Sequence, residues 1–171
     1  MNQGLIILNC ARGTYNKYCP TSVEKYKYNR VVKNIISLAS KFDPKDIFYV
    51  IDKHQKDDFE FYFLPKHFTG YDSIPDTHVL ANIGQCEVLI QNSLSCLDSE
   101  HNRKLILRHD LDQYIVSGFL GCFNIIPTCL ALIQNKKKPI VIKDYISDID
   151  DTYEDICLKY LSILGILRLE I

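Results

Sequence analysis

The chain has 171 residues, of which 47% are hydrophobic and 24% charged, and its formal net charge at pH 7 is −1. This size predicts one domain spanning residues 1–171, and the balanced charge gives no reason to expect nucleic acid as a partner. No apolar run reaches the ~20 residues of a membrane-spanning helix, and the N-terminus lacks a basic signal region. We therefore expect a cytoplasmic protein with no membrane partner. The seven cysteines show no CxxC spacing and are expected to be reduced, buried thiols.

Short apolar runs alternate with helical patterns along the chain. Strands are expected at 5–8, 47–51, 88–90, 114–117, 140–143 and 166–170. Helices are expected at about 21–41 with Thr21 or Ser22 as the cap, from Asp98 or Ser99 to 109, at 125–135, and at 151–164 before Gly165. Residues 52–84 have no clear period and are expected to form a long irregular connection. This alternation predicts an α/β fold, a three-layer α/β/α sandwich around a mostly parallel sheet of about six strands.

The segment 118–124 is a tight turn between a strand and the start of a helix. Ligands bind and nucleophiles are placed at such turns in open parallel sheets. Cys122 lies in this turn, where the helix dipole is expected to lower its pKa and could make it a nucleophile. The alternative is a small buried side chain, which is the more common outcome, and no obvious base lies nearby in the sequence.

Three amide side chains stand at or beside strand ends. Asn9 follows the first strand, Gln91 follows the third, and Asn124 begins the helix after the tight turn. Because parallel strands end at the same edge of a sheet, we expect these side chains to meet in one crevice. Amides form hydrogen bonds but do not titrate, so they supply neither a general base nor an activated nucleophile.

A second group of residues could bind a metal. Asp52-x-His54 ends the second strand, and Glu60 and His67 follow in the next loop. Mixed nitrogen and oxygen ligands suit a divalent zinc, iron or manganese ion. The alternative is a polar loop with exposed acidic and histidine side chains, because a D-x-H pattern alone is weakly specific.

Six segments together resemble the isochorismatase-like cysteine hydrolases, the family that includes the nicotinamidases. The family's D-x-Q after the first strand, its D-x-H pair and its W-P-x-H-C-x-x-G segment correspond to LIILNCA at 5–11, DKH at 52–54 and LPKHFTG at 64–70. Its lysine-ended third strand, G-x-A-T-D-x-C-V-x-x-T signature and V-x-x-D correspond to VLIQ at 88–91, GFLGCFNIIPT at 118–128 and VIKD at 141–144. The resemblance covers nearly the whole chain and implies the family's Rossmann-like sheet.

The resemblance also implies a changed active site. The family's catalytic aspartate, lysine and cysteine fall on Asn9, Gln91 and Asn124, and Cys122 lies two residues before the nucleophile position. A displacement of about 1 Å can already cost 100-fold in rate, so Cys122 is a poor substitute. The cis peptide that helps to form the family's oxyanion hole would fall on the Phe119–Leu120 bond.

The metal site is the part that the resemblance implies is kept. In nicotinamidases, the equivalents of Asp52, His54, Glu60 and His67 hold a divalent metal that binds the pyridine nitrogen. Family members also commonly assemble into dimers or larger rings, which implies a homo-oligomer.

Three functions remain open. The first is a catalytically inactive family member, a pseudoenzyme that binds a small molecule or another protein. The second is a hydrolase of a nicotinamide-like or other C–N amide substrate, which uses the metal site with water, or Cys122. The third is a scaffold that uses the fold for oligomerisation, with the aromatic residues of 59–71 at an interface.

Overall fold

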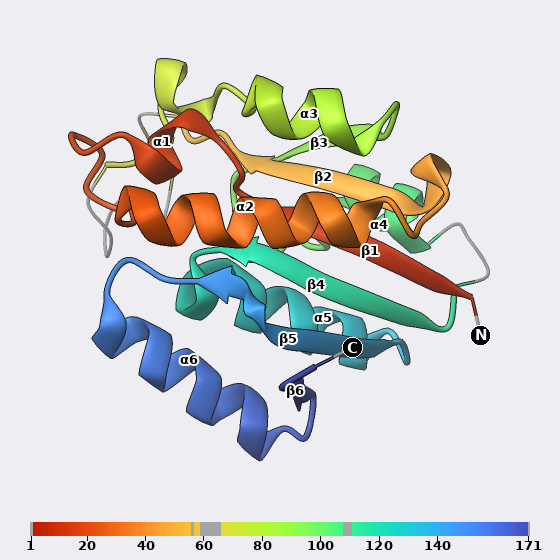
Figure 1. Cartoon of the computed structure of the whole chain (residues 1–171). Coiled ribbons are helices and arrows are strands. Elements are labelled where there is room, and N and C mark those ends of the chain that lie inside the picture. The colour runs from red at the N-terminus through yellow and green to blue at the C-terminus, as the bar shows by residue number, and fades with distance from the viewer. Residues whose placement is uncertain (1, 56, 59–65, 108–110, 171) are drawn as a thin grey trace.

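A computed structural model describes residues 2–55, 57–58, 66–107 and 111–170 of the chain. These residues form a six-stranded sheet in the order β3-β2-β1-β4-β5-β6, and each neighbouring pair is parallel (Figure 1). The strands are β1 (Gln3–Leu8), β2 (Ile47–Asp52), β3 (Glu87–Gln91), β4 (Gln113–Phe119), β5 (Lys138–Ser147) and β6 (Leu167–Arg168). The predicted six-stranded α/β fold is therefore confirmed, and the sheet is parallel throughout.

Helices cover both faces of the sheet. They are α1 (Arg12–Tyr15), α2 (Lys25–Ala39), α3 (Thr77–Ile83), α4 (Glu100–Leu107), α5 (Ile126–Gln134) and α6 (Asp151–Ile163). Successive residues of a strand point to opposite faces, so β1 divides its side chains between two cores. Ile7 packs in one core with residues of α2 and α3, whereas Ile6 packs in the other with residues of α4, α5 and α6. The result is the predicted three-layer sandwich.

The start of α2 differs from the sequence prediction. The helix begins at Lys25 after Glu24, whose side chain makes no capping hydrogen bond. Thr21 and Ser22 are therefore not the caps. The chain before the helix instead returns to α1, because the Val23 N–H donates to the Thr14 carbonyl oxygen at 2.7 Å.

The connection at 52–84 is less irregular than its sequence suggests, because it contains α3. Asp76 caps this helix by accepting a hydrogen bond from the His78 N–H at 2.8 Å, and it also accepts one from the Tyr28 hydroxyl at 2.6 Å. The helix has only seven residues, so its apolar period is too short to recognise from sequence. The long structureless loop predicted here is wrong for residues 77–83.

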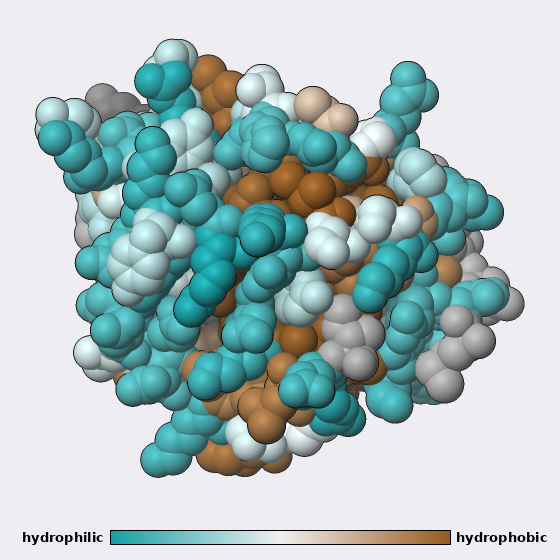
Figure 2. Space-filling view, in the orientation of Figure 1, coloured by the Kyte–Doolittle hydropathy of each residue, from teal (hydrophilic) through white to brown (hydrophobic). Residues whose placement is uncertain are grey.

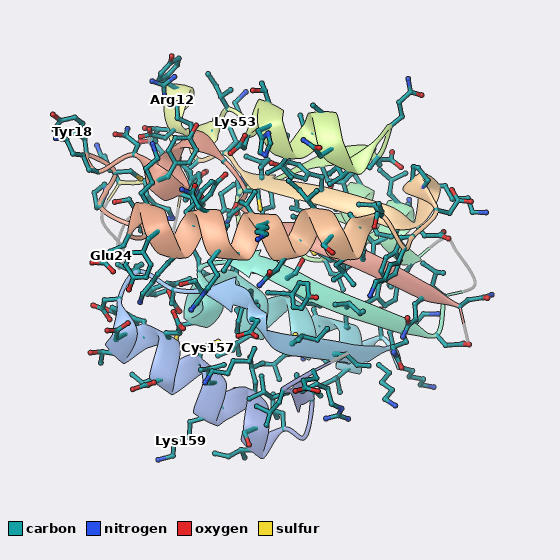
Figure 3. All side chains as sticks on the ribbon, in the orientation of Figure 1. Arg12, Tyr18, Glu24, Lys53, Cys157 and Lys159 are labelled. Atoms are coloured by element: carbon teal, nitrogen blue, oxygen red, sulfur yellow. The ribbon has the colours of Figure 1, made fainter. Side chains whose placement is uncertain are left out.

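Two other predicted helix ends are confirmed. The Ser99 hydroxyl accepts a hydrogen bond from the Asn102 N–H at 3.4 Å just before α4, and Gly165 follows α6 with a φ of 71°. In Figure 3, Cys157 of α6 points toward the sheet and Lys159 points away from it. Among the described residues, no helix has the length and apolar character required to span a bilayer.

Candidate functional site

Four polar side chains meet at the carboxyl edge of the sheet. Asn9 follows β1, Asp52 ends β2, Gln91 ends β3, and Asn124 lies in the turn between β4 and α5. None is more than 3% exposed. Asp52 and Gln91 are direct neighbours in the parallel register of β2 and β3. The convergence of the three amides predicted from sequence is thus confirmed, and its centre is the Asp52 carboxylate.

All three amides donate hydrogen bonds to Asp52. The Asn9 Nδ2 lies 2.8 Å from Asp52 Oδ2, and the Asn124 Nδ2 lies 3.5 Å from Oδ1. Gln91 Nε2 also donates to Oδ1. Asn9 also accepts a hydrogen bond from the same residue, because its Oδ1 lies 2.8 Å from the Asp52 backbone N–H. Asn9 Nδ2 also approaches Asn124 Oδ1 at 3.2 Å, which closes the cluster.

These hydrogen bonds surround the buried Asp52 carboxyl group with N–H donors. A carboxylate accepts several hydrogen bonds, and N–H donors favour its ionised form. One polar atom of the cluster, Gln91 Oε1, is buried and accepts no hydrogen bond from the described residues. The cluster therefore holds a carboxyl group and a neutral acceptor, with no titratable nucleophile or base at the three amide positions.

Two histidines adjoin the cluster. His54 Nε2 lies 4.0 Å from Asp52 Oδ2, and the His54 and His67 rings are 4.6 Å apart between centroids. The loop is shaped by the backbone, since the His54 N–H donates to the Phe68 carbonyl oxygen at 3.1 Å. Burial, and then the neighbouring His67, lowers the pKa of His54 and favours its neutral form. A neutral imidazole is the form that binds a metal.

Asp52, His54 and His67 fit a divalent metal. All three are buried, and each offers one ligand atom that lies within 4.8 Å of the others. Two imidazoles and one carboxylate suit zinc, iron or manganese. Asp58 supports this set from behind, because its Oδ2 lies 3.4 Å from His54 Nδ1 and leaves Nε2 directed toward Asp52. Glu60, the fourth predicted ligand, lies outside the described residues.

The tight turn forms one π-helical turn at Gly121–Ile125, preceded by Leu120 in the left-handed region at φ 63°. The Phe119–Leu120 peptide is trans, which corrects the cis bond implied by the resemblance. The Leu120 carbonyl oxygen accepts the Asn124 N–H at 2.7 Å. That N–H is therefore engaged inside the turn rather than directed at a substrate oxygen.

Cys122 makes its hydrogen bonds to residues outside the amide cluster, and its pKa shifts in the direction opposite to that expected. Its thiol donates to the Tyr153 carbonyl oxygen at 3.2 Å, and its N–H donates to Asp148 Oδ2 at 2.7 Å. Burial, followed by the nearby Asp148 carboxylate, raises the pKa of Cys122 to about 12. The expectation of a pKa lowered by the helix dipole is wrong, because desolvation outweighs the dipole here.

The raised pKa predicts an unreactive thiol. At pH 8, we expect iodoacetamide to alkylate Cys122 roughly 100-fold more slowly in the folded protein than in the urea-unfolded chain. Peptide mass spectrometry over a time course measures both rates at the same residue, so the unfolded chain is the matched control. Alkylation of the folded protein at the rate of the unfolded chain would contradict this assignment.

The sequence did not identify three further contributors. Asp58 supports His54, the Leu94 carbonyl oxygen accepts from Asn124 Nδ2 at 3.3 Å, and the Thr14 hydroxyl donates to the Asn9 carbonyl oxygen. Only Asp58 carries a signal in the sequence, as an acid close to the D-x-H pair. The other two contacts depend on loop geometry that the sequence does not reveal.

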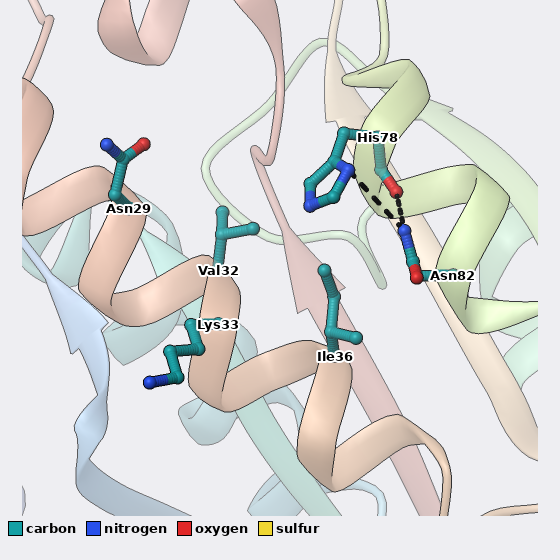
Figure 4. Close-up of a pocket in the computed structure, with 6 residues that line it drawn as sticks. All are labelled: Asn29, Val32, Lys33, Ile36, His78 and Asn82. Atoms are coloured by element: carbon teal, nitrogen blue, oxygen red, sulfur yellow. Dashed lines mark hydrogen bonds between the residues drawn. The ribbon is translucent and has the colours of Figure 1, made fainter.

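A separate groove lies between α2 and α3, and it contains no residue of the amide cluster or the metal site (Figure 4). Its volume is about 310 Å³. The lining residues are Asn29, Val32, Lys33, Ile36, His78 and Asn82. Figure 2 shows the brown, hydrophobic surface between α2 and α3 with hydrophilic side chains around it.

Solved structures show what this chain is similar to, whereas no family model and no curated protein sequence matches it. A pyrazinamidase of Pyrococcus horikoshii in complex with zinc superposes with a TM-score of 0.82 at 13% identity, over 100% of both chains. A pyrazinamidase/nicotinamidase from Streptococcus mutans gives 0.78 at 16% identity, over 97% of this chain and 99% of that one.

An octameric hydrolase of unknown specificity from Escherichia coli gives 0.74 at 14% identity, over 97% of this chain and 74% of that one. Likeness at these identities establishes the backbone arrangement and leaves the chemistry to the side chains described above. The chain therefore has the fold of the nicotinamidases and isochorismatase-like hydrolases, as its sequence resemblance predicts.

Proposed function

We propose that this protein is a catalytically inactive relative of the nicotinamidases that acts by binding a ligand, a small molecule or another protein, at a metal-bearing site. The observation that carries the proposal is the hydrogen bonding of Asn9, Gln91 and Asn124 to Asp52. Three side chains at the family's catalytic positions donate to one carboxylate, and none of them titrates. In this proposal they hold Asp52 in place instead of taking part in a reaction.

The two histidines and the carboxylate of the site support binding of a divalent metal, either zinc, iron or manganese. Asp52, His54 and His67 would hold it, and Asp58 would orient His54. When bound, such an ion would supply a Lewis-acidic position for a ligand nitrogen or oxygen. Gln91 Oε1 offers a buried acceptor for a ligand N–H close to the same carboxylate. A small nicotinamide-like molecule with a metal-binding nitrogen and an N–H donor fits this chemistry.

A second candidate function is favoured by the same three ligands. A metal held by two histidines and one carboxylate can activate water, and an amide hydrolase with such altered machinery needs no cysteine. Cys122 does not support this candidate, because its pKa is raised to about 12. We rank it below the inactive protein because no side chain at the three amide positions can transfer a proton.

The resemblance and the composition support proposals for the domain organisation, the location and the partners. We propose a single domain over residues 1–171 in the cytoplasm, with no nucleic acid or membrane as partner. We also propose a homo-oligomer, a dimer or larger, which the octameric hydrolase with the same fold supports. Of the aromatic interface predicted at 59–71, residues 59–65 lie outside the described residues, Phe68 is buried, and Tyr71 is 60% exposed.

A hydrolysis screen tests the proposal. Purified full chain, loaded in turn with zinc, iron or manganese, is incubated with nicotinamide, pyrazinamide and a vinyl-ether substrate, and ammonia or product release is measured. We expect no release above the protein-free control. Release that disappears in Asn124→Ala would overturn the proposal. Release that survives Asn124→Ala but requires the metal would establish the second candidate instead.

A further inference from the structure

The outer surface of α6 carries a row of large, partly exposed apolar side chains, of which Tyr153 also contacts the Phe123 ring, with 5.5 Å between the ring centroids. Tyr153 is 38% exposed, Ile156 54%, Tyr160 41% and Ile163 74%. Their spacing is three, four and three residues, which places all four along one side of the helix. We call these four residues the α6 stripe. The same spacing is found at the contact positions of paired helices.

The fold itself does not need the α6 stripe. The side of α6 that faces the sheet is occupied by Cys157 and Leu161, which are at most 1% exposed. The helix is also fixed at its start, because the buried Lys27 ammonium of α2 binds Asp151 and lies 3.6 Å from Glu154 Oε2. The brown surface at the lower edge of Figure 2 lies where Figure 1 places the C-terminal end of α6. The helix therefore presents a second apolar side that the described elements leave partly exposed.

We propose that the α6 stripe is the contact surface for a second copy of this chain, with the two α6 helices antiparallel about a two-fold axis. In that arrangement Tyr153 of one copy faces Ile163 of the other, and Ile156 faces Tyr160. Every layer then pairs one aromatic ring with one branched aliphatic side chain. An isologous contact requires such self-complementarity.

The charges of α6 favour a second copy of this chain as the partner, and they favour antiparallel packing of the two helices. The first half of α6 is acidic, with Asp150 at the cap followed by Asp151, Glu154 and Asp155, whereas Lys159 lies in the second half. Antiparallel packing brings Lys159 of one copy near Asp155 of the other and opposes the two helix dipoles. Parallel packing would bring the acidic halves together, and an anionic membrane surface would be repelled by them.

This inference extends the homo-oligomer of the proposed function by naming its surface, and it does not depend on the ligand. The contact is small, so we expect a dissociation constant on the order of 10–100 µM. Sedimentation equilibrium of the full chain over a matching concentration range should show the mass rising from 19.8 kDa toward twice that value.

Two variants and one control test the surface. Ile156→Asp and Ile163→Asp each place a charge in the stripe and should weaken association at least 10-fold. Ser162→Asp adds the same charge to an exposed position of α6 outside the stripe and should change association less than 2-fold. Circular dichroism establishes that all three remain folded, which is expected because the substituted side chains are largely exposed.

A mixed disulfide tests the direction. Chains carrying Tyr153→Cys and chains carrying Ile163→Cys, distinguished by tag, should form a cross-linked heterodimer on mild oxidation in preference to either homodimer. Cross-linking of each variant with itself would overturn the antiparallel arrangement.

Three outcomes of the sedimentation test would overturn the inference, and they bear differently on the oligomer. A dimer that is insensitive to both aspartate variants would remove this surface and leave the homo-oligomer in place. A monomer at all concentrations would rule out both this contact surface and the homo-oligomer. Sedimentation of the monomer with phosphatidylcholine vesicles, lost in Ile163→Asp, would assign the stripe to a lipid surface instead. None of these results alters the hydrolysis screen.

Discussion

Asp52→Ala is expected to lower zinc affinity at least 100-fold and, in metal-free buffer, to lower the free energy of unfolding by about 3 kcal/mol. The affinity falls because a metal ligand is lost. The stability falls because Asn9, Gln91 and Asn124 lose their common acceptor in a buried site, and each unsatisfied donor costs about 1 kcal/mol or more. Calorimetric zinc titration and urea unfolding with EDTA measure the two effects separately.

Asp58→Asn provides the matched control for this prediction. Asp58 contacts His54 from outside the ligand set, and its side chain is 16% exposed. We expect a 10- to 100-fold loss of zinc affinity, typical of a group behind a metal-binding histidine, with little change in metal-free stability. If Asp52→Ala bound zinc as tightly as the wild type, the metal would have to be held elsewhere.

Asn9→Asp, a change of one amide to a carboxylate, is expected to lower the free energy of unfolding by about 3 kcal/mol at pH 7. Asn9 Nδ2 donates to Asp52 Oδ2 at 2.8 Å, and the substitution replaces this donor with a second negative charge in a buried site. The backbone is not the cause. Asn9 has a φ of 56°, and aspartate tolerates the left-handed region nearly as well as asparagine.

Gln91→Lys in the same chain should recover a substantial part of that loss. Position 91 already contacts Asp52 Oδ1, so an ammonium group there would lie beside the Asp52 carboxylate and offset the added negative charge. A double-mutant cycle by urea unfolding should give a favourable coupling of at least about 1 kcal/mol. Strictly additive effects would show that positions 9 and 91 do not share the Asp52 environment.

The sequence predicts the framework of this site better than its details. Strand ends place Asn9, Asp52 and Gln91 at one edge, because parallel strands with a right-handed crossover leave no other position for them. The pairing of His54 with His67 follows from the resemblance to the nicotinamidases, because the D-x-H pattern alone is weakly specific. What the sequence does not show is that the three amides all donate to Asp52, since hydrogen-bond partners depend on side-chain rotamers and on atomic distances.

Local environment also overrides simple rules in two places. The position of Cys122 before α5 predicts a lowered pKa, yet burial beside Asp148 raises it. The polar residues before α2 predict a cap at Thr21 or Ser22, yet a backbone contact between Val23 and Thr14 delays the helix to Lys25. In both cases a contact between residues that are not sequence neighbours decides the outcome.

The proposal to test first is that the pocket still binds its ligand and that amides replace the family's three reactive side chains. Its most direct test is ammonia release from nicotinamide by the zinc-loaded variant Asn9→Asp, Gln91→Lys, Asn124→Cys, measured beside the zinc-loaded wild type. We predict release by the triple variant at least 100-fold above the wild type, whose rate equals the protein-free background. Release by the wild type at the rate of the triple variant would contradict the claim.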